Sequence, residues 1–275
     1  MARSHLLGTL ALIALAYSSL SCTPTEEQSL WQPRPLTMAE QTSLGNRVDF
    51  FSQLPPSYRP DSDWRSALSE PLKNVEPQYS QAMEELVIRD FFNDRKGGFF
   101  VDVGCHLPKK DSTTYYLERH LNWTGIGIDA MAHFAKGWAD SRPNSTFVHA
   151  AISDKDGEIL ELHIAGPFVS LDVSVIELWG LTAAKTIQVE TSTLDTLLTE
   201  QGIKTIDFMS IDIEGVELAA LKGLDLTRFR PELIGIETLH HDEVIAILDA
   251  NDYEWIEKYY KVDKINLYFK PRLAE

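Results

Sequence analysis

The chain has 275 residues, 44% of them hydrophobic and 24% charged, which is enough to bury a core of ordinary size and excludes a disordered or fibrous protein. Its formal net charge of −16 and its short basic runs exclude the basic footprint that nucleic-acid binding requires. We therefore expect one α/β domain with appendages and no nucleic-acid partner.

Residues 1–21 have the pattern of an export signal. Arg3 precedes an apolar run over residues 6–17, which is too short for a comfortable membrane span, and small residues surround a cleavage point near Ser21. Because Cys22 directly follows this point, the segment also resembles a bacterial lipoprotein signal, in which Cys22 would be lipidated and would tether the protein to a membrane. A plain signal peptide or short anchor is the main alternative, and a cytosolic protein with an apolar N-terminus is the lesser one. We expect a membrane-associated or exported protein.

The composition shifts in the middle of the eighties. Eight of the thirteen prolines lie between Pro24 and Pro77, whereas thirteen of the fifteen glycines lie at or after Gly97. We expect a flexible linker over residues 22–45, an N-terminal extension over 46–79 that packs on the core, and a catalytic-type domain over 80–275. The extension contains apolar residues, Phe50, Phe51, Leu54, Trp64 and Leu68, but too few of them to form a domain.

From residue 80 onward the pattern becomes regular and predicts alternating elements. Helices are expected at 80–94, 112–121, 131–141, 192–202, 215–223 and 241–251. Strands are expected at 99–104, 123–131, 145–153, 157–165, 185–191, 206–214 and 232–238, and two more within 253–270 form a hairpin around Val262, Asp263 and Lys264. This alternation indicates a mostly parallel sheet with helices on both faces and a C-terminal antiparallel hairpin.

The first strand of that sheet ends in a loop that suits a small cofactor. Asp102 and Gly104 lie at the carboxyl end of the strand, where ligands bind in a doubly wound sheet. A single glycine lets the main chain approach closely, but the bulky residues that follow do not suit a pyrophosphate. A tight turn with no ligand is the alternative for this loop.

Two further aspartates follow the next strands. Asp129 ends the second strand about 25 residues after Gly104, where a carboxylate can accept both hydroxyls of a ribose. Asp154, with Ser153, follows the third strand, where a polar side chain can reach an adenine amino group. A helix cap for Asp129 and a turn residue for Asp154 are the alternatives.

Carboxylates also converge at the end of the strand predicted over 206–214. Ser210, Asp212 and Glu214 share one face of it by the period of two, just before Gly215. Buried carboxylates need a cationic or hydrogen-bonding partner, which points to a cationic cofactor, a divalent metal or a substrate proton. Capping of the next helix is the alternative.

Glu237, His240 and His241 form a further polar group at the same edge. A histidine there suits general-base work on a hydroxyl, although adjacent histidines at a helix start are also common as surface or capping residues. Asp212, Glu214 and Glu237 are the candidate ligands if a divalent metal binds, but no spacing dictates one.

Taken together, "FVDVGCHLPKKDSTTYYLERHLNWTGIGIDAM", "AAISDKDG", "VETSTLDTLL" and "IDFMSIDIEGVELAALKG" resemble the FkbM-type methyltransferase family over about residues 80 to 270. The resemblance implies a Rossmann-like class I fold and an S-adenosylmethionine-dependent O-methyltransferase, acting on sugars and related hydroxylated compounds. It places Asp102 and Gly104 beside the methionine part of the cofactor, Asp129 on the ribose, Asp154 near the adenine and Asp212 near the reacting centre.

The methyl acceptor implied is a small molecule or a glycan, and the general base is Asp212, His240 or His241. Cys105 and His106 stand where relatives often have Ala-Asn or Ala-His, which leaves the class of acceptor open. Two other readings remain. One is an exported, non-enzymatic binding lipoprotein that retains the fold, since this cofactor is made in the cytosol and the signal favours export; the other is a nucleotide-sugar enzyme.

Overall fold

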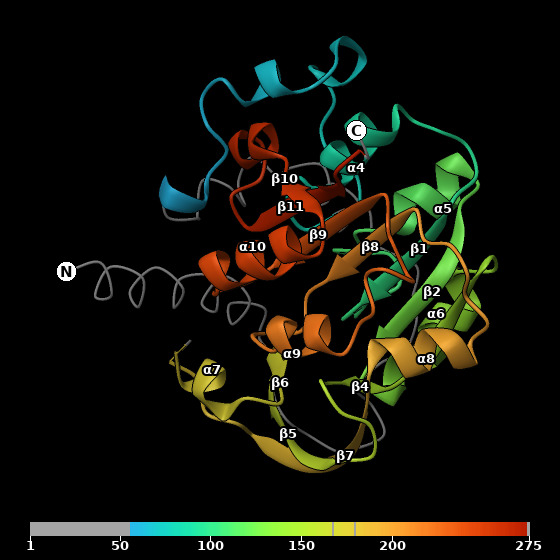
Figure 1. Ribbon diagram of the computed structural model, residues 1–275, viewed down its shortest axis with the longest axis vertical. Coiled ribbons are helices and arrows are strands. Elements are labelled where there is room, and N and C mark those ends of the chain that lie inside the picture. Colours follow the sequence, from blue (N-terminus) through green and yellow to red (C-terminus); the bar gives the residue numbers. More distant parts are fainter. Residues whose placement is uncertain (1–55, 167, 179, 274–275) are drawn as a thin grey trace, which may run out of the picture.

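The computed structural model describes residues 56–166, 168–178 and 180–273 (Figure 1). The predicted signal over 1–21, the lipidation site at Cys22, the linker over 22–45 and the first part of the extension lie outside the described residues. Within the described residues, no helix is both long and apolar enough to cross a membrane.

The chain alternates between strands and helices from residue 84 to residue 271. The helices are α4 (Glu84–Phe92), α5 (Tyr115–Leu121), α6 (Ala135–Ser141), α7 (Val173–Leu178), α8 (Leu194–Glu200), α9 (Glu217–Lys222) and α10 (His241–Ala250). The strands are β1 (Phe99–Val103), β2 (Thr124–Asp129), β3 (Ser145–His149), β4 (Ala151–Ile152), β5 (Ile159–Ala165), β6 (Phe168–Ser170), β7 (Lys185–Ser192), β8 (Phe208–Ile211), β9 (Leu233–Glu237), β10 (Tyr253–Trp255) and β11 (Asn266–Pro271). Short 3-10 segments cover Pro56–Tyr58, Trp64–Ala67, Glu70–Leu72, Ala132–Phe134 and Glu257–Lys261.

A central seven-stranded sheet has the order β10-β11-β9-β8-β1-β2-β3. Strands β3, β2, β1, β8 and β9 are parallel, while β11 pairs antiparallel with both β9 and β10. The predicted Rossmann-like fold, with an antiparallel C-terminal pair on a mostly parallel sheet, is confirmed. A second sheet, β4-β7-β5-β6, lies at the end of the molecule toward which the central strands run (Figure 1).

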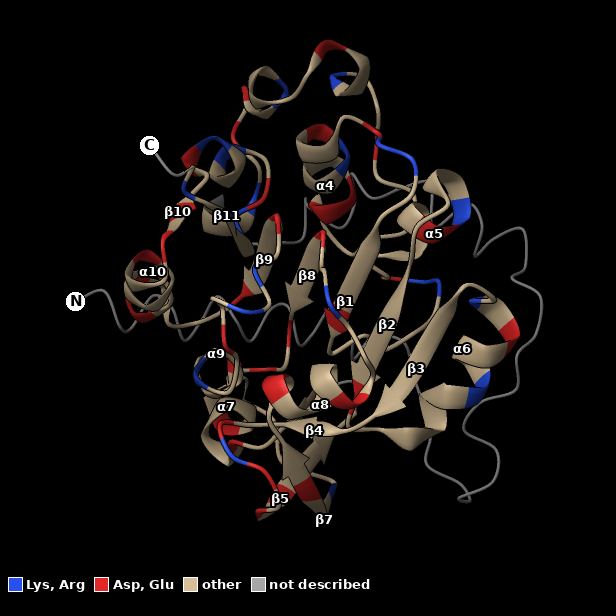
Figure 2. Ribbon diagram, turned by 45° about the vertical axis from the view of Figure 1, so that its right-hand side comes forward, with Lys and Arg blue, Asp and Glu red and all other residues tan. Residues whose placement is uncertain are grey.

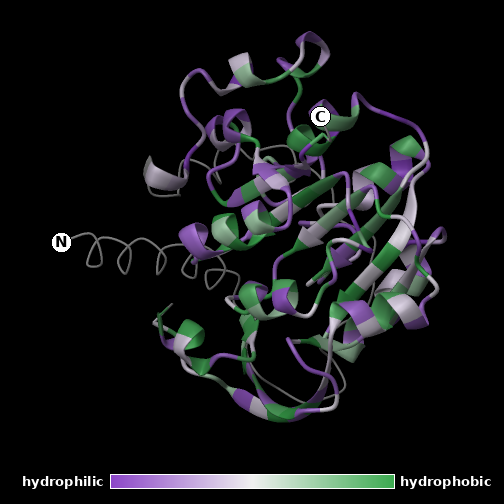
Figure 3. Ribbon diagram, in the orientation of Figure 1, coloured by the Kyte–Doolittle hydropathy of each residue, from purple (hydrophilic) through white to green (hydrophobic). Residues whose placement is uncertain are grey.

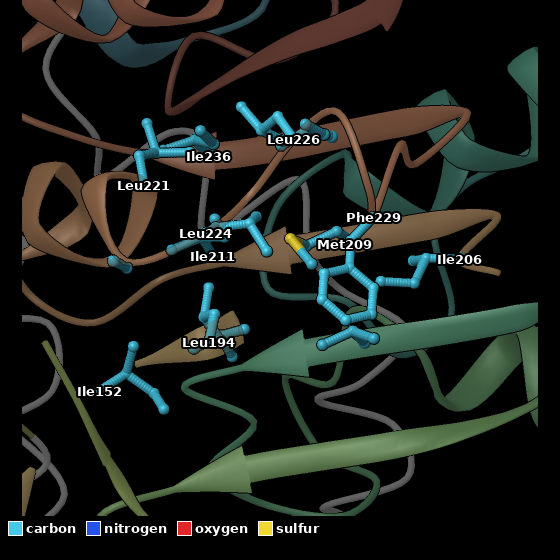
Figure 4. Close-up of a cluster of buried hydrophobic side chains, with 14 of the residues drawn as sticks. Ile152, Leu194, Ile206, Met209, Ile211, Leu221, Leu224, Leu226, Phe229 and Ile236 are labelled. Carbon is cyan, nitrogen blue, oxygen red and sulfur yellow. The ribbon is translucent and has the colours of Figure 1, made fainter. Parts of the chain in front are cut away.

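The two faces of the central sheet bury separate apolar clusters. One cluster contains Val101, Met209 and Ile234 and packs against α8, α9 and α10 (Figure 4). The other contains Phe100, Phe208 and other apolar residues and packs against α4 and α5. Because neighbours along a strand point to opposite faces, both clusters come from the same apolar strands, which appear green in Figure 3.

The N-terminal extension packs on the second of these clusters. Trp64, Leu68 and Leu72 are buried among residues of α4 and of the central strands. A third, smaller cluster joins Ala165, Phe168, Val175 and Ile176 of the second sheet and α7 to Tyr58 of the extension and to Leu239 and Ile265 of the core. Three parts of the chain that are far apart in sequence therefore meet at one end of the molecule.

Several predicted details differ from the structure. The helix expected over 80–94 is shorter: α4 begins at Glu84 and ends at Phe92, where Asn93 follows it at φ 50°. The C-terminal strands are not joined by a tight turn around Asp263, because the 3-10 segment at Glu257–Lys261 lies between them and β11 inserts between β9 and β10. Strand β6 and helix α7 were not predicted from the sequence, since three and six residues are too few for a periodic signal.

Candidate active site

A cavity opens at the carboxyl ends of the central strands. Among the residues that the structure describes, its lining includes seven acidic ones, Glu84, Asp102, Asp111, Asp129, Asp212, Glu214 and Glu237, and no Lys or Arg. Its apolar lining includes Ile128 of the central strand β2 and Met131 after it, and Ile152, Leu162, Phe168 and Leu171 of the second sheet and its flanks. Figure 2 shows acidic segments gathered where the central strands run toward the second sheet.

The acidic lining continues the face of the sheet that packs against α4 and α5. Phe100, Phe208 and Leu233 form an apolar row across β1, β8 and β9 on that face. Two residues further along each strand, Asp102, Ser210 and Gly235 are in register. The next positions on this face of β8 and β9 are Asp212 and Glu237, so the surface changes from apolar to acidic toward the carboxyl ends.

Gly104 brings the main chain of the first loop against the loop after β8. Its φ is +85°, and a Cβ atom on it would lie 1.7 Å from the Asp212 carbonyl oxygen. The backbone N–H of Gly104 donates to the Ile128 carbonyl at 2.8 Å. Only glycine combines this backbone conformation with so close an approach.

Asp102 is buried behind this loop. It accepts a hydrogen bond from the Thr114 hydroxyl at 2.7 Å, so Thr114, although at the start of α5, makes no side-chain cap of that helix. Burial raises the pKa of the Asp102 carboxyl, while the Thr114 hydroxyl and Arg142 oppose that rise. The Thr114 hydroxyl thereby links the Asp102 side chain to the start of α5.

Arg142 holds the loop between β1 and α5 in place. Its Nε donates to Glu118 at 2.6 Å, and its other nitrogens donate to the Pro108 carbonyl, the Ser112 hydroxyl and the Thr114 hydroxyl. Arg142 and Glu118 are both buried, with 1% and 5% of their surface exposed. The buried ion pair thereby fixes the loop that carries the cavity residues Cys105, a free and buried thiol, and His106.

Asp129 ends β2 and faces the cavity with both carboxylate oxygens engaged. The N–H of His106 donates to one oxygen at 3.0 Å and the N–H of Met131 to the other at 2.7 Å. Burial raises the pKa of Asp129 to about 6, although these two N–H groups lower it. The carboxylate is thus oriented by the backbone of two different loops.

The loop after β8 is tightly built around Glu217. Glu214 adopts φ +55° and Gly215 φ +98°, and the Glu217 carboxylate accepts the N–H groups of Ile213 at 3.2 Å and Gly215 at 2.8 Å. Ser170 of β6 donates its hydroxyl to the Glu214 carbonyl at 2.7 Å. This arrangement fixes Asp212 and Glu214 at the cavity and links them to the second sheet.

These carboxyls are protonated more readily than usual because they are buried close together. Burial, and then the charge of Glu217, raises the pKa of Asp212 to about 7. Burial, and then the charge of Asp212, raises the pKa values of Glu214 and Glu237 well above the ordinary value. Within the described residues no cationic side chain offsets this rise, so the three carboxyls keep their protons to higher pH than usual and ionise more readily beside a cationic ligand.

Other predicted site residues do not reach this cavity. Asp154 is exposed in the turn after β4, where the lining consists of Ala150, Ala151 and Ile152. His240 is exposed at the start of α10, and His241 packs edge-on against Tyr260, so neither lines the cavity. All three residues follow the ends of strands, but the chain has left the cavity by the time it reaches them.

The three carboxylates considered as metal ligands lie at the cavity but do not form a metal site. Asp212, Glu214 and Glu237 all line the cavity, yet the described residues contain no group of three or more His, Cys, Asp or Glu side chains that could hold a metal ion.

Sequence reasoning missed Glu84, Arg142 and the apolar wall from the second sheet. Glu84 lies three residues before Val87 on the buried face of the predicted helix, and an acidic residue on a buried face is a signal that could have been used. Arg142 carried no comparable signal, because its partners are 24 to 34 residues away in sequence.

A family model matches most of the region that builds this cavity. The family model for the methyltransferase FkbM domain matches residues 102–255, more than half of the chain. A search of curated proteins found no match.

Among solved structures, a TehB-like SAM-dependent methyltransferase from Corynebacterium glutamicum is similar at 12% identity and a TM-score of 0.40, covering 70% of this chain and 89% of its own. A precorrin-6y C5,15-methyltransferase from Geobacter metallireducens is similar at 13% identity and a TM-score of 0.37, covering 78% of this chain and 96% of its own. On the match to the family model, the chain belongs to the FkbM methyltransferase domain family.

Proposed function

We propose that this protein transfers a methyl group from S-adenosylmethionine to a hydroxyl group of a sugar or another hydroxylated small molecule. The observation that carries the proposal is the acidic cavity at the carboxyl ends of the central strands. Carboxylates that no Lys or Arg of the described chain accompanies in the lining favour a ligand that brings its own positive charge. The ammonium and sulfonium groups of S-adenosylmethionine meet that requirement.

The residues present fit this cofactor. Asp102 and the backbone at Gly104 would hold the amino acid part, and Asp129, already oriented by two N–H groups, would accept the ribose hydroxyls. The apolar walls at Ile128, Met131 and Ile152 suit a flat adenine ring, in place of the contact expected from Asp154. One close glycine suffices, since an adenosine with an amino acid tail has no pyrophosphate to cradle.

Asp212 is the best placed general base. S-Adenosylmethionine supplies an electrophilic methyl carbon on a positively charged sulfur, so the protein needs only to align the acceptor oxygen and receive its proton. The backbone N–H of Asp212 donates to the Val103 carbonyl at 2.9 Å, which fixes the residue beside β1. With a pKa of about 7, its carboxylate can accept a proton at neutral pH.

Isothermal titration of the full-length protein with S-adenosylmethionine, with and without Mg²⁺, tests the proposal. We expect Asp129→Ala to weaken cofactor binding by about ten-fold or more, because charge-assisted hydrogen bonds would be lost. Asp154→Ala is the matched control and should bind as the native protein does, since Asp154 is exposed outside the cavity. The proposal fails if millimolar cofactor gives no binding under either condition.

We also propose that the N-terminus is processed as a lipoprotein at Cys22 and holds the protein at a membrane. The support is the order of Arg3, the apolar run over residues 6–17 and Cys22. Mass spectrometry of the mature N-terminus from fractionated cells tests this, and an unprocessed Met1 would rule it out.

A further inference from the structure

The end of the cavity nearest β9 holds two carboxyl groups that the proposed cofactor does not engage. Glu214 and Glu237 both line the cavity, and neither carboxylate receives a hydrogen bond or an ion pair from the described part of the chain. Asp102, Asp129 and Asp212 already lie where the proposed cofactor and the reacting oxygen would be held. Two buried carboxylates therefore remain for a second cation.

Ser210 is an independent sign of a ligand at this end. Only 7% of its surface is exposed, it lines the cavity, and its hydroxyl has no hydrogen-bond partner among the described residues. The hydroxyl is therefore open to the cavity, where a polar atom of a ligand can pair with it. Ser210 lies on β8, two residues before Asp212, and pairs with Gly235 of β9, the strand that ends in Glu237.

A divalent metal is the less suitable cation for this place. Within the described residues, the acidic side chains of the cavity are not arranged so that three of them could hold one ion. An ammonium group needs less, since it is satisfied by two carboxylates and one hydroxyl at hydrogen-bond distance.

We propose that the methyl acceptor carries a protonated amine in addition to its hydroxyl group, as an amino sugar or amino alcohol does, and that Glu214, Glu237 and Ser210 bind this amine. The inference rests on the proposed function, because it names the acceptor of the same site. In the reaction the acceptor oxygen forms a bond to the methyl carbon, the carbon–sulfur bond breaks, and sulfur keeps the electron pair as S-adenosylhomocysteine forms. The hydroxyl proton passes to the Asp212 carboxylate, while the amine is held and is not methylated.

Paired probes that differ only in the amine test the inference. The full-length protein, saturated with S-adenosylhomocysteine, is titrated with D-glucosamine and with D-glucose, and, in a ligand-observed NMR assay, with ethanolamine and with ethylene glycol. We expect the amine of each pair to bind at least about ten-fold more tightly, as charge-assisted hydrogen bonds to two carboxylates require. Glu237→Gln and Glu214→Gln should each reduce that preference, while cofactor binding persists.

Glu190→Gln is the matched control, since Glu190 is an exposed glutamate of β7 outside the cavity, and it should keep the full preference. Equal binding within both pairs, including no binding of any probe, overturns the inference. A Mg²⁺ isotherm that Glu237→Gln abolishes, without any preference for amines, overturns it in favour of a metal. Failure of S-adenosylmethionine to bind in the separate titration would instead count against the proposed function.

Discussion

At the residue scale, Gly104 combines two constraints that can be separated by substitution. We predict that Gly104→Ala abolishes cofactor binding and lowers the free energy of unfolding by several kcal/mol, on the order of 3, because a Cβ atom would collide with the Asp212 carbonyl and also strain the backbone. Titration calorimetry and chemical unfolding measure the two effects. Gly202→Ala is the control, since Gly202 has a similar φ of +69° with nothing within 4 Å of the added Cβ. Equal losses in both variants would show that strain alone, and not the close approach, matters.

The buried pair of Arg142 and Glu118 gives a second prediction at this scale. Arg142→Met leaves the Glu118 carboxylate buried without its cation, which costs about 3–5 kcal/mol of unfolding free energy. Arg142→Lys keeps the charge but not the planar fork that reaches the Pro108 carbonyl and the Thr114 hydroxyl, so it should fall between the native protein and Arg142→Met. Urea unfolding checks both. A native-like stability of Arg142→Met would mean that the pair is not what holds the loop after β1.

At the scale of elements, the sequence is a good guide to the central sheet because burial on both faces produces apolar strands that stand out. The runs around Val101, Met209 and Ile234 predict strands correctly for this reason. The position of β11 between β9 and β10 has no local signal, since it depends on pairing across the sheet. The same limit applies to the site: Asp102, Asp129, Asp212 and Glu237 follow from strand ends, whereas the turn of the chain at Asp154 and His240 is set by contacts distant in sequence.

The contact between Tyr58 and the second-sheet region supports a prediction about elements. Tyr58 of the N-terminal extension packs against the cluster of Phe168, Val175 and Ile176. Phe168 of β6 lines the cavity, and Ser170 of the same strand donates to the carbonyl of Glu214 in the loop after β8. Tyr58→Ala should speed amide hydrogen exchange in β6 and α7 by about ten-fold, as expected for a loss of about 1.4 kcal/mol of local packing. Exchange in β1 and β8 should not change.

Tyr58→Phe tests whether packing or the hydroxyl is responsible. It retains the ring, so we expect exchange in β6 and α7 to stay at the native rate. Faster exchange in Tyr58→Phe, or a uniform increase across β1 and β8 in Tyr58→Ala, would show that the extension does not stabilise the second sheet locally.

At the scale of the whole molecule, the raised pKa values of the cavity carboxyls link its charge to stability. A carboxyl whose pKa is higher in the folded protein than in the unfolded chain favours folding while it stays protonated, and this contribution is lost as pH rises through the folded pKa. Asp212 loses it between about pH 4, its ordinary pKa, and its folded pKa of about 7, while Glu214 and Glu237, whose pKa values are raised well above the ordinary value, lose it over a range that begins there and extends well above it. Groups with lowered pKa values instead make the protein more stable as pH rises, up to their ordinary pKa. The stability gained from Asp90 and Asp156 is fully present above about pH 5, and that from His106 above about pH 6.5.

We therefore predict that the cofactor-free protein is less stable at pH 8 than at pH 6.5, by about 1–2 kcal/mol or a few degrees in Tm. Glu237→Gln should remove part of this decline and should be more stable than the native protein at pH 8, because the amide carries no charge to bury. Glu190→Gln should leave the decline intact. If S-adenosylmethionine binds as proposed, it should stabilise the protein more at pH 8 than at pH 6.5, because its cationic groups compensate the carboxylates that have ionised there. A Tm that rises from pH 6.5 to 8 without ligand would show that the cavity carboxyls are already neutralised by some part of the chain.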